Sequence, residues 1–216
     1  MCAEIVSNIT AAEPERAEIP TRIARAAAHL FATEGYDATS VRHIVEAASV
    51  TKPTLYYYFE SKEGLARALL TAPIGRLSVT LDSIVNGPAP ATEKLAAVID
   101  EHFKLCHDDP DTARFAYALF FGPRSSKLAV ELADLGLLLA ESVHKVICCL
   151  ADEQVIEADR IEECTAATRG LICIYTMDFL YRDLVLPAEL SQRLVVDLLQ
   201  GFGQRRAASD AKVERN

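Results

Sequence analysis

The side chains best suited to binding a polar ligand gather between Thr51 and Phe59. An ammonium group, a hydroxyl and three phenols stand there in close succession, on Lys52, Thr54, Tyr56, Tyr57 and Tyr58. Such groups hydrogen-bond to phosphate oxygens and to base edges in the major groove of DNA. Because a helix turns each successive side chain by about 100°, three adjacent tyrosines cannot all be buried. The stretch therefore predicts an exposed face suited to nucleic acid.

Short helices must hold this face. We expect them at Thr21–Glu34, Val41–Ala48 and Lys52–Phe59. Gly35 is a favourable left-handed stop for the first helix, and Thr39 or Ser40 supplies an N-cap oxygen for the second. Pro53 lies in the first turn of the third helix, where a missing N–H costs nothing. Two short helices joined by a three-residue turn, with another packed across them, form a helix-turn-helix.

This segment resembles the TetR family of transcriptional regulators over about residues 20–70. The first matching motif is Ala32-x-x-Gly35-Tyr36-x-Ala38-Thr39-Ser40-Val41-x-x-Ile44-x-x-x-Ala48-x-Val50. The second is Thr54-Leu55-Tyr56-x-Tyr58-Phe59-x-x-Lys62-x-x-Leu65. A lone helix-turn-helix pattern is a weak signal, but both motifs in this order near the N-terminus are specific.

The resemblance implies a role for each matching position. Arg42 corresponds to a position that reads a base edge, and Lys52 and Tyr57 to positions that face the major groove. The positions that correspond to contacts with backbone phosphates are Thr39, Ser40, Thr54, Tyr56, Tyr58 and Lys62. Lys62 would act as a phosphate clamp at the N-terminus of the following helix.

The rest of the chain is predicted to be helical. Glycine and proline are sparse, at nine each, and no long stretch alternates apolar and polar residues. We expect an all-α fold of about nine helices, with a disordered arm at 1–19, a DNA-binding domain at 20–70, a ligand-binding and dimerisation domain at 71–206 and a frayed tail at 207–216. The expected later helices are about Lys62–Val85, Thr92–His107, Thr112–Phe121, Ser125–Ala151, Ile156–Leu184 and Pro187–Arg206, and Pro73 or Gly75 should kink or interrupt the first of these.

Charge and composition narrow the class of protein. The net charge is −9 over 216 residues, yet residues 20–70 hold six basic and five acidic side chains. The excess of acidic residues therefore lies outside this segment. This asymmetry fits a small nucleic-acid reader joined to an acidic body. No uncharged run approaches the ~18 residues of a membrane helix, and the N-terminus does not read as a signal peptide, which predicts a cytoplasmic protein. Catalytic and nucleotide-binding motifs are absent from the sequence, so we expect no enzyme and no cofactor.

The resemblance makes the acidic body a sensor and a dimerisation domain. The stretch Cys164–Tyr181 is apolar on nearly every side, so a helix there must be buried on two faces. In the last helix, apolar side chains recur at four-residue spacing, at Leu190, Leu194, Leu198 and Phe202. These last two helices are expected to form a homodimer. Candidate pocket residues are His102, Phe103, Cys106, Phe115, Tyr117, Phe120, Phe121, His144, Cys148, Tyr175, Met177, Asp178 and Tyr181, each of which is at least as well explained as core.

Two histidine–cysteine pairs raise the possibility of a metal site. His102 and Cys106, and likewise His144 and Cys148, are four residues apart and so share a helix face. Neither pair follows a known zinc spacing, and we predict no metal. Adjacent Cys148 and Cys149 point in different directions and rarely join.

The function predicted from the sequence is a ligand-responsive, DNA-binding transcriptional regulator. We expect a homodimeric repressor that a small, largely apolar effector releases from its operator. The alternative is a ligand-independent DNA-binding adaptor whose C-terminal domain binds a protein partner. The sequence leaves open which effector, which operator, and whether the protein represses or activates.

Overall fold

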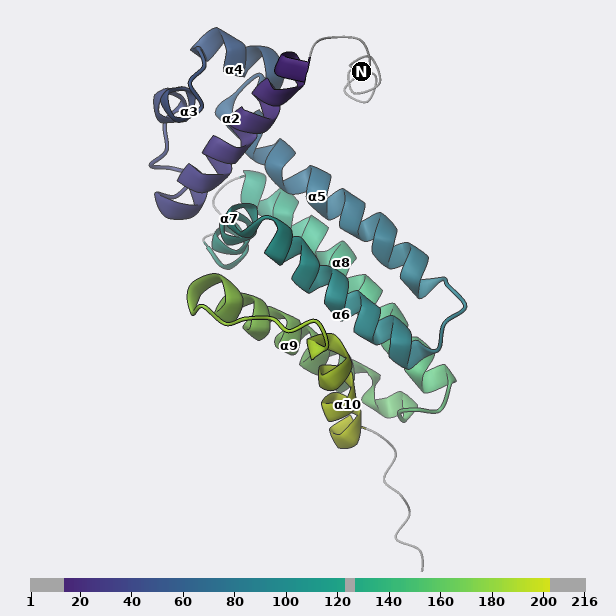
Figure 1. Cartoon of the computed structure of the whole chain (residues 1–216). Helices are drawn as coiled ribbons and strands as arrows, with labels where there is room; N and C mark the ends of the chain where they lie inside the picture. Colours follow the sequence, from purple (N-terminus) through teal and green to yellow (C-terminus); the bar gives the residue numbers. More distant parts are fainter. Residues whose placement is uncertain (1–13, 123–126, 203–216) are drawn as a thin grey trace, which may run out of the picture. The chain divides into compact units, whose positions relative to one another are not determined.

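The computed structural model describes residues 14–122 and 127–202, with side chains described from residue 18 to residue 200 on either side of the gap (Figure 1). This part of the chain contains nine α-helices, one 3-10 helix and no strand. In chain order the elements are α2 Pro14–Thr33, α3 Val41–Ala47, α4 Lys52–Phe59, α5 Lys62–Val85, α6 Ala91–Asp108, α7 Pro110–Phe121, α8 Lys127–Asp152, η1 Ala158–Arg160, α9 Ile161–Tyr181 and α10 Leu190–Phe202. The all-α prediction is confirmed.

The chain forms two compact units that share two helices. The first unit comprises residues 1–75 and 108–135, and the second comprises residues 76–107 and 136–216. Helices α5 and α8 therefore each begin in the first unit and end in the second. The first unit includes α7, which we had expected within a separate C-terminal domain.

The first unit is built on α2, which packs against α7, α3 and α4. Phe31 of α2 and Phe115 of α7 are fully buried, with ring centroids 4.8 Å apart. Tyr36 lies in the turn after α2, and its ring centroid is 5.2 Å from that of Phe31. Such aromatic clusters contribute stability beyond the area they bury. Phe115 is thus a core residue of this unit, and its expected place in a ligand pocket stays a prediction.

The second unit has its own hydrophobic core. Buried side chains of α6 and α8 pack with those of α9, α10 and the second half of α5 in one cluster. The largest fully buried members are Leu81, Leu95, Ile99, Ile147 and Leu150. In α6 and α8 these recur at three- and four-residue spacing, which is the pattern of a helix with one buried face.

Several helix bounds differ from those predicted. Helix α2 begins at Pro14, so residues 14–19 belong to a helix and not to an arm, and α5 runs through Pro73 without interruption. Helix α9 ends at Tyr181 instead of continuing to residue 184, and Asp183 there has a positive φ of 57°. The rest of the expected arm and the whole expected tail lie outside the described residues.

Helix α5 is long and apolar enough, by length and composition alone, to cross a membrane. Its buried residues Leu70, Ile74, Leu77 and Leu81 follow a three- and four-residue spacing. This one-sided burial is the pattern of an amphipathic helix with one face against the rest of the protein.

Candidate nucleic-acid interface

The turn between α3 and α4 is fixed by local hydrogen bonds. The Ser40 hydroxyl accepts from the His43 N–H and caps α3, and the Thr51 hydroxyl accepts from the Thr54 N–H and caps α4. The Val50 N–H donates to the Val45 carbonyl at 2.9 Å, which closes the end of α3. Both helices are therefore bounded by capping interactions, and α4 is held as a short rod behind a rigid turn.

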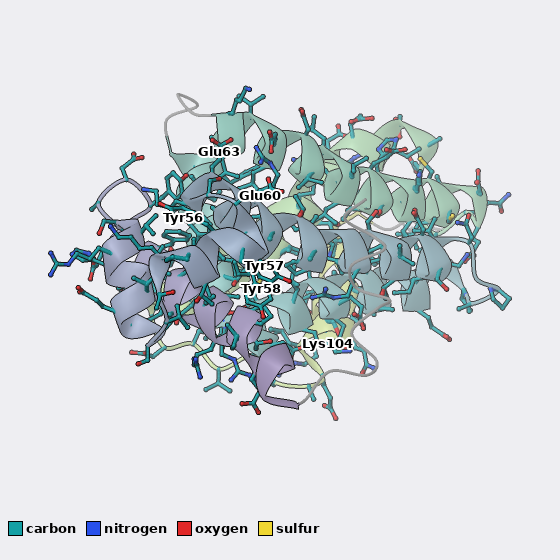
Figure 2. All side chains as sticks on the ribbon, turned by 90° about the horizontal axis from the view of Figure 1, so that it is seen from above. Tyr56, Tyr57, Tyr58, Glu60, Glu63 and Lys104 are labelled. Atoms are coloured by element: carbon teal, nitrogen blue, oxygen red, sulfur yellow. The ribbon has the colours of Figure 1, made fainter. Side chains whose placement is uncertain are left out.

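Helix α4 presents its polar side outward. Leu55 is fully buried, whereas the side chain of Tyr57 is 82% exposed and that of Tyr56 is 45% exposed. Lys52 is exposed and Tyr58 is half-buried. The rings of Tyr57 and Tyr58 lie together, with centroids 5.0 Å apart and nearly perpendicular planes (Figure 2). The predicted exposure of part of the tyrosine run is confirmed.

Arg42 lies exposed on α3 and pairs with Glu46 one turn later. Its Nε donates to Glu46 Oε1 at 2.7 Å, and this hydrogen bond lowers the pKa of the Glu46 carboxyl. An ion pair this exposed contributes little to stability, because water screens it. Arg42 can therefore exchange the carboxylate for an acceptor on DNA at little cost.

Thr39 and Lys62 have internal partners, which changes their expected roles. Thr39 is 1% exposed, and its hydroxyl donates to the Gly35 carbonyl at 2.8 Å. This burial contradicts the expected DNA contact by the Thr39 side chain. The Lys62 ammonium donates to the carbonyls of Tyr36 and Thr39, at 2.8 and 2.9 Å, and stands 4.2 Å from the centre of the Tyr36 ring. It closes the loop between α2 and α3 from inside the protein.

Two residues that sequence reasoning overlooked support α4. The Thr51 hydroxyl, besides capping the helix, lies 2.8 Å from that of Thr54 and orients it; the T-x-x-T spacing was the available signal. Gly64 lies where a Cβ atom would overlap the carbonyl oxygen of Phe59. Only glycine therefore lets the first turn of α5 approach the end of α4 so closely.

The candidate pocket residues are divided between the two units. Tyr117, Phe120 and Phe121 belong to the first unit, where the Phe121 ring lies 5.9 Å from Tyr117 and 5.1 Å from Phe120. Phe120 and Phe121 are exposed. The remaining candidates, apart from the buried Phe115, lie in the second unit.

Helices α6 and α9 bring four of the candidates in the second unit close to each other. Phe103 and Tyr175 have ring centroids 6.2 Å apart, and burial raises the pKa of the Cys106 thiol to about 11. The fully buried Thr176 hydroxyl has no partner at standard hydrogen-bond geometry, although its contact with Cys106 partly offsets that rise. His102 Nδ1 lies 2.7 Å from the Val98 carbonyl, and burial lowers the pKa of His102.

The other candidates in the second unit lie at two places, near the start of α9 and at its end. His144 Nε2 lies 3.5 Å from Cys148 Sγ, and its Nδ1 lies 3.4 Å from the Thr165 hydroxyl. Asp178 pairs with Arg182, Met177 is half-buried and Tyr181 is exposed. Among the described residues no three histidine, cysteine or acidic side chains are grouped as a metal site would require.

A capped helix-turn-helix with an exposed second helix, carried by an all-helical chain, defines a DNA-binding protein of the helix-turn-helix class. Comparison with known proteins finds similarity to transcriptional regulators. Residues 23–69 match the sequence model of bacterial regulatory proteins of the tetR family. The chain is 25% identical over 185 residues to the uncharacterized HTH-type transcriptional regulator YdgC of Bacillus subtilis, covering 84% of this chain and 91% of that protein.

Two further relatives carry more specific names. The fatty acid metabolism regulator protein of Bacillus subtilis is 34% identical over 92 residues, which are 43% of this chain and 47% of that protein. The structure of the ketosteroid transcriptional regulator KstR2 of Mycobacterium tuberculosis superposes with a TM-score of 0.70 at 20% identity, covering 86% of this chain and 95% of the other. All three relatives are named as regulators, none as an enzyme. Residues 23–69 thus form a DNA-binding segment of the tetR type, and over most of its length the chain is similar to proteins named as transcriptional regulators.

Proposed function

We propose that this protein is a cytoplasmic, homodimeric repressor that a small, largely apolar effector releases from its operator. In this proposal Arg42, Lys52 and Tyr57 contact base edges in the major groove. The residues that contact backbone phosphates are Ser40, Thr54, Tyr56 and Tyr58. The observation that carries the assignment is the exposed, capped α4, whose outer side offers donors while Leu55 anchors its inner side.

The effector site of this proposal lies between α6 and α9 in the second unit. Phe103 and Tyr175 offer aromatic walls, and the Thr176 hydroxyl is a buried donor without a partner of standard geometry. An unsatisfied buried hydroxyl is costly, so a ligand oxygen that accepts its hydrogen bond would gain affinity. Half-buried His102, held neutral by its lowered pKa, adds a second polar group without adding charge. Two of the relatives are named for fatty acids and a ketosteroid, which supports an apolar ligand.

The proposed dimer uses an apolar stripe on α9. Ala166, Gly170, Ile174, Met177 and Tyr181 follow at three- and four-residue spacing, so they share one face. Ile174 is 50% exposed and Tyr181, two turns later on the same face, is 52% exposed, so two large apolar side chains of this stripe face solvent. Covering such a stripe with its own symmetry copy gives a two-fold interface, and a two-fold dimer presents two α4 helices to two half-sites.

The test is release of DNA. The protein is first bound to an operator selected from random duplexes, and the complex is titrated with a long-chain acyl-CoA, a free fatty acid and a sterol ketone. The proposal predicts that one of these lowers operator affinity about 5–150-fold, the usual range of allosteric coupling. It also predicts that Thr176→Val reduces the response while leaving operator affinity without ligand unchanged. An operator complex unaffected by every probe, with a tight protein partner recovered instead, would favour the adaptor.

A further inference from the structure

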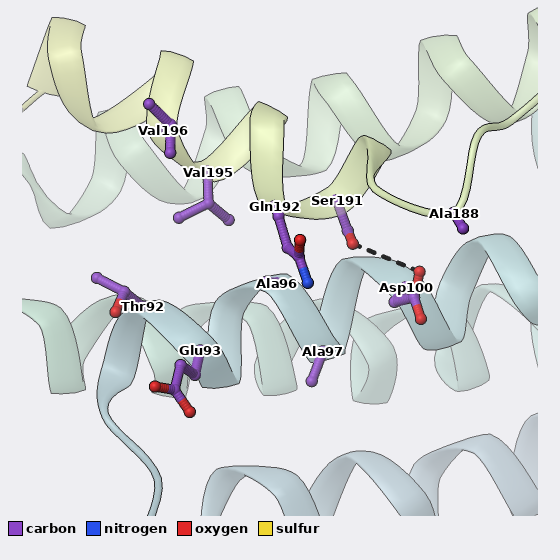
Figure 3. A pocket seen from close by; sticks show the side chains of 10 residues that line it. All are labelled: Thr92, Glu93, Ala96, Ala97, Asp100, Ala188, Ser191, Gln192, Val195 and Val196. Atoms are coloured by element: carbon purple, nitrogen blue, oxygen red, sulfur yellow. Dashed lines mark hydrogen bonds between the residues drawn. The ribbon is translucent and has the colours of Figure 1, made fainter.

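A groove of about 620 Å³ lies between α6 and α10 in the second unit (Figure 3). It runs beside the first turns of α6, from Thr92 to Asp100, whereas the proposed effector site involves the last turns of that helix and α9. Its other wall is formed by the residues from Ala188 to Val196. The groove is therefore a separate surface, which the proposed function leaves unused.

The lining of the groove combines small apolar side chains with two carboxylates. Ala96 and Ala97 leave room above α6, and Val196 on the opposite wall is 54% exposed. Glu93 and Asp100 are exposed at either end of this stretch of α6. Within the described residues neither carboxylate forms an ion pair, and Asp100 accepts only a long hydrogen bond of 3.4 Å from the Ser191 hydroxyl. The groove thus carries two negative charges that no cation of the described chain neutralises.

The two carboxylates are spaced along a line. Glu93, Ala97 and Asp100 follow one another at four- and three-residue spacing and so share one face of α6. Seven residues of α-helix separate the ends by about 10.5 Å, with an apolar stretch between them. One metal ion cannot bridge carboxylates at that distance, because metal–oxygen bonds are only about 2.0–2.6 Å long.

We propose that this groove binds a linear aliphatic polyamine, with one ammonium group at Glu93, another at Asp100 and methylene groups over Ala97. The charge is complementary at both ends, and the apolar middle matches the hydrocarbon segments between the amines. Gln192, which also lines the groove, offers a side-chain carbonyl to an inner ammonium group. The surrounding charge has the same sign, since the whole chain carries −9, and this attracts polycations.

The test is calorimetric titration of the purified 216-residue protein with spermidine at low ionic strength. We expect saturable binding of one spermidine per chain, and binding at least about tenfold weaker for 1,3-diaminopropane, which is too short to reach both carboxylates. Glu93→Gln and Asp100→Asn should each weaken spermidine about threefold, and the double variant about tenfold, as expected for exposed ion pairs. Asp82→Asn removes one exposed carboxylate of α5 and should leave the affinity unchanged.

Three results would overturn the proposal. One is the absence of saturable heat up to millimolar spermidine. Another is an equal loss of affinity in Asp82→Asn, which would show that the acidic surface attracts polyamines without a site. The third is equal affinity for diaminopropane and spermidine, which would remove the argument from spacing. Far-ultraviolet circular dichroism of each variant confirms that the helices are retained, so a loss of binding is not a loss of fold.

Discussion

The ammonium of Lys62, at the start of α5, donates a hydrogen bond to the Thr39 carbonyl, 23 residues earlier in the chain, at 2.9 Å. A second bond to the Tyr36 carbonyl makes this lysine the connection between α5 and the loop that leads into α3. The resemblance to the family had suggested a phosphate contact for the same group. The two roles differ in a measurable way, because a phosphate contact depends on salt and an internal bond does not.

Lys62→Met should lower the free energy of unfolding by about 1–3 kcal/mol, because two carbonyls lose a charged donor. Operator affinity should fall as well, but the slope of log Kd against log salt should stay as in the wild type. Denaturant unfolding and DNA titrations at several salt concentrations measure both quantities. As a matched control, Lys52→Met removes an exposed cation of α4 and should leave stability within about 0.5 kcal/mol of the wild type. A reduced slope with normal stability in Lys62→Met would restore the phosphate contact.

Arg42→Ala should relax base preference at one position of each half-site, with a loss of about 1–3 kcal/mol of discrimination. Stability should change little, since the ion pair with Glu46 is exposed. Titration of operator variants that differ at single base pairs measures the effect. Glu46→Gln, which frees the guanidinium, should bind the operator at least as tightly as the wild type. If Arg42→Ala weakens all sequences equally, Arg42 contacts the backbone and not a base.

Ile174→Asp should convert the protein to a monomer and abolish tight operator binding, because it places charges on the apolar stripe of α9 at the proposed two-fold interface. Sedimentation velocity measures the change in mass, and circular dichroism should show unchanged helix content. Val79 is an exposed residue of α5, away from the stripe, and a Val79→Asp protein should remain dimeric. A dimeric Ile174→Asp protein would place the interface on another surface.

Because of His102, the free energy of unfolding should decrease as the pH is lowered through about 6.5. Burial lowers the pKa of His102 in the folded protein, so the unfolded chain takes up a proton first as the pH falls. The contribution of His102 is therefore fully present above the unfolded pKa and is lost progressively down to the folded pKa. Urea unfolding at pH 7.5, 6.5 and 5.5 should show a smaller decline for His102→Gln than for the wild type. Parallel declines in the two proteins would mean that His102 remains solvated.

Local patterns predicted the helix-turn-helix because its determinants are close in sequence. Ser40 caps α3, Pro53 lies in the first turn of α4, and Leu55 and Phe59 are one turn apart. Each of these signals acts within four residues. The short α4, its cap and the exposure of Tyr57 could therefore be read without any knowledge of tertiary structure.

Long-range contacts account for what the sequence did not predict. In the sequence, Phe115 belongs to the same aromatic run as the candidate pocket residues of α7. Only its contact with Phe31, 84 positions away, identifies it as a core residue. Lys62 is similarly bound to a carbonyl 26 positions away. Periodicity tells which side of a helix is buried but not what buries it. The assignment of α7 to the first unit and the groove beside α10 follow from such contacts alone.

Selection of binding sites from random duplex DNA measures whether α4 recognises a sequence. We expect the wild-type protein to enrich a two-fold symmetric sequence whose half-sites lie about one helical turn, ~34 Å, or a multiple of it apart. Two chains, or a multiple of two, should bind each duplex. Replacing Lys52 and Tyr57 together by alanine should eliminate the enrichment while helix content is retained. Failure of the wild-type protein to enrich any sequence at low ionic strength, or equal enrichment by the double variant, would contradict the assignment of α4 as the recognition helix.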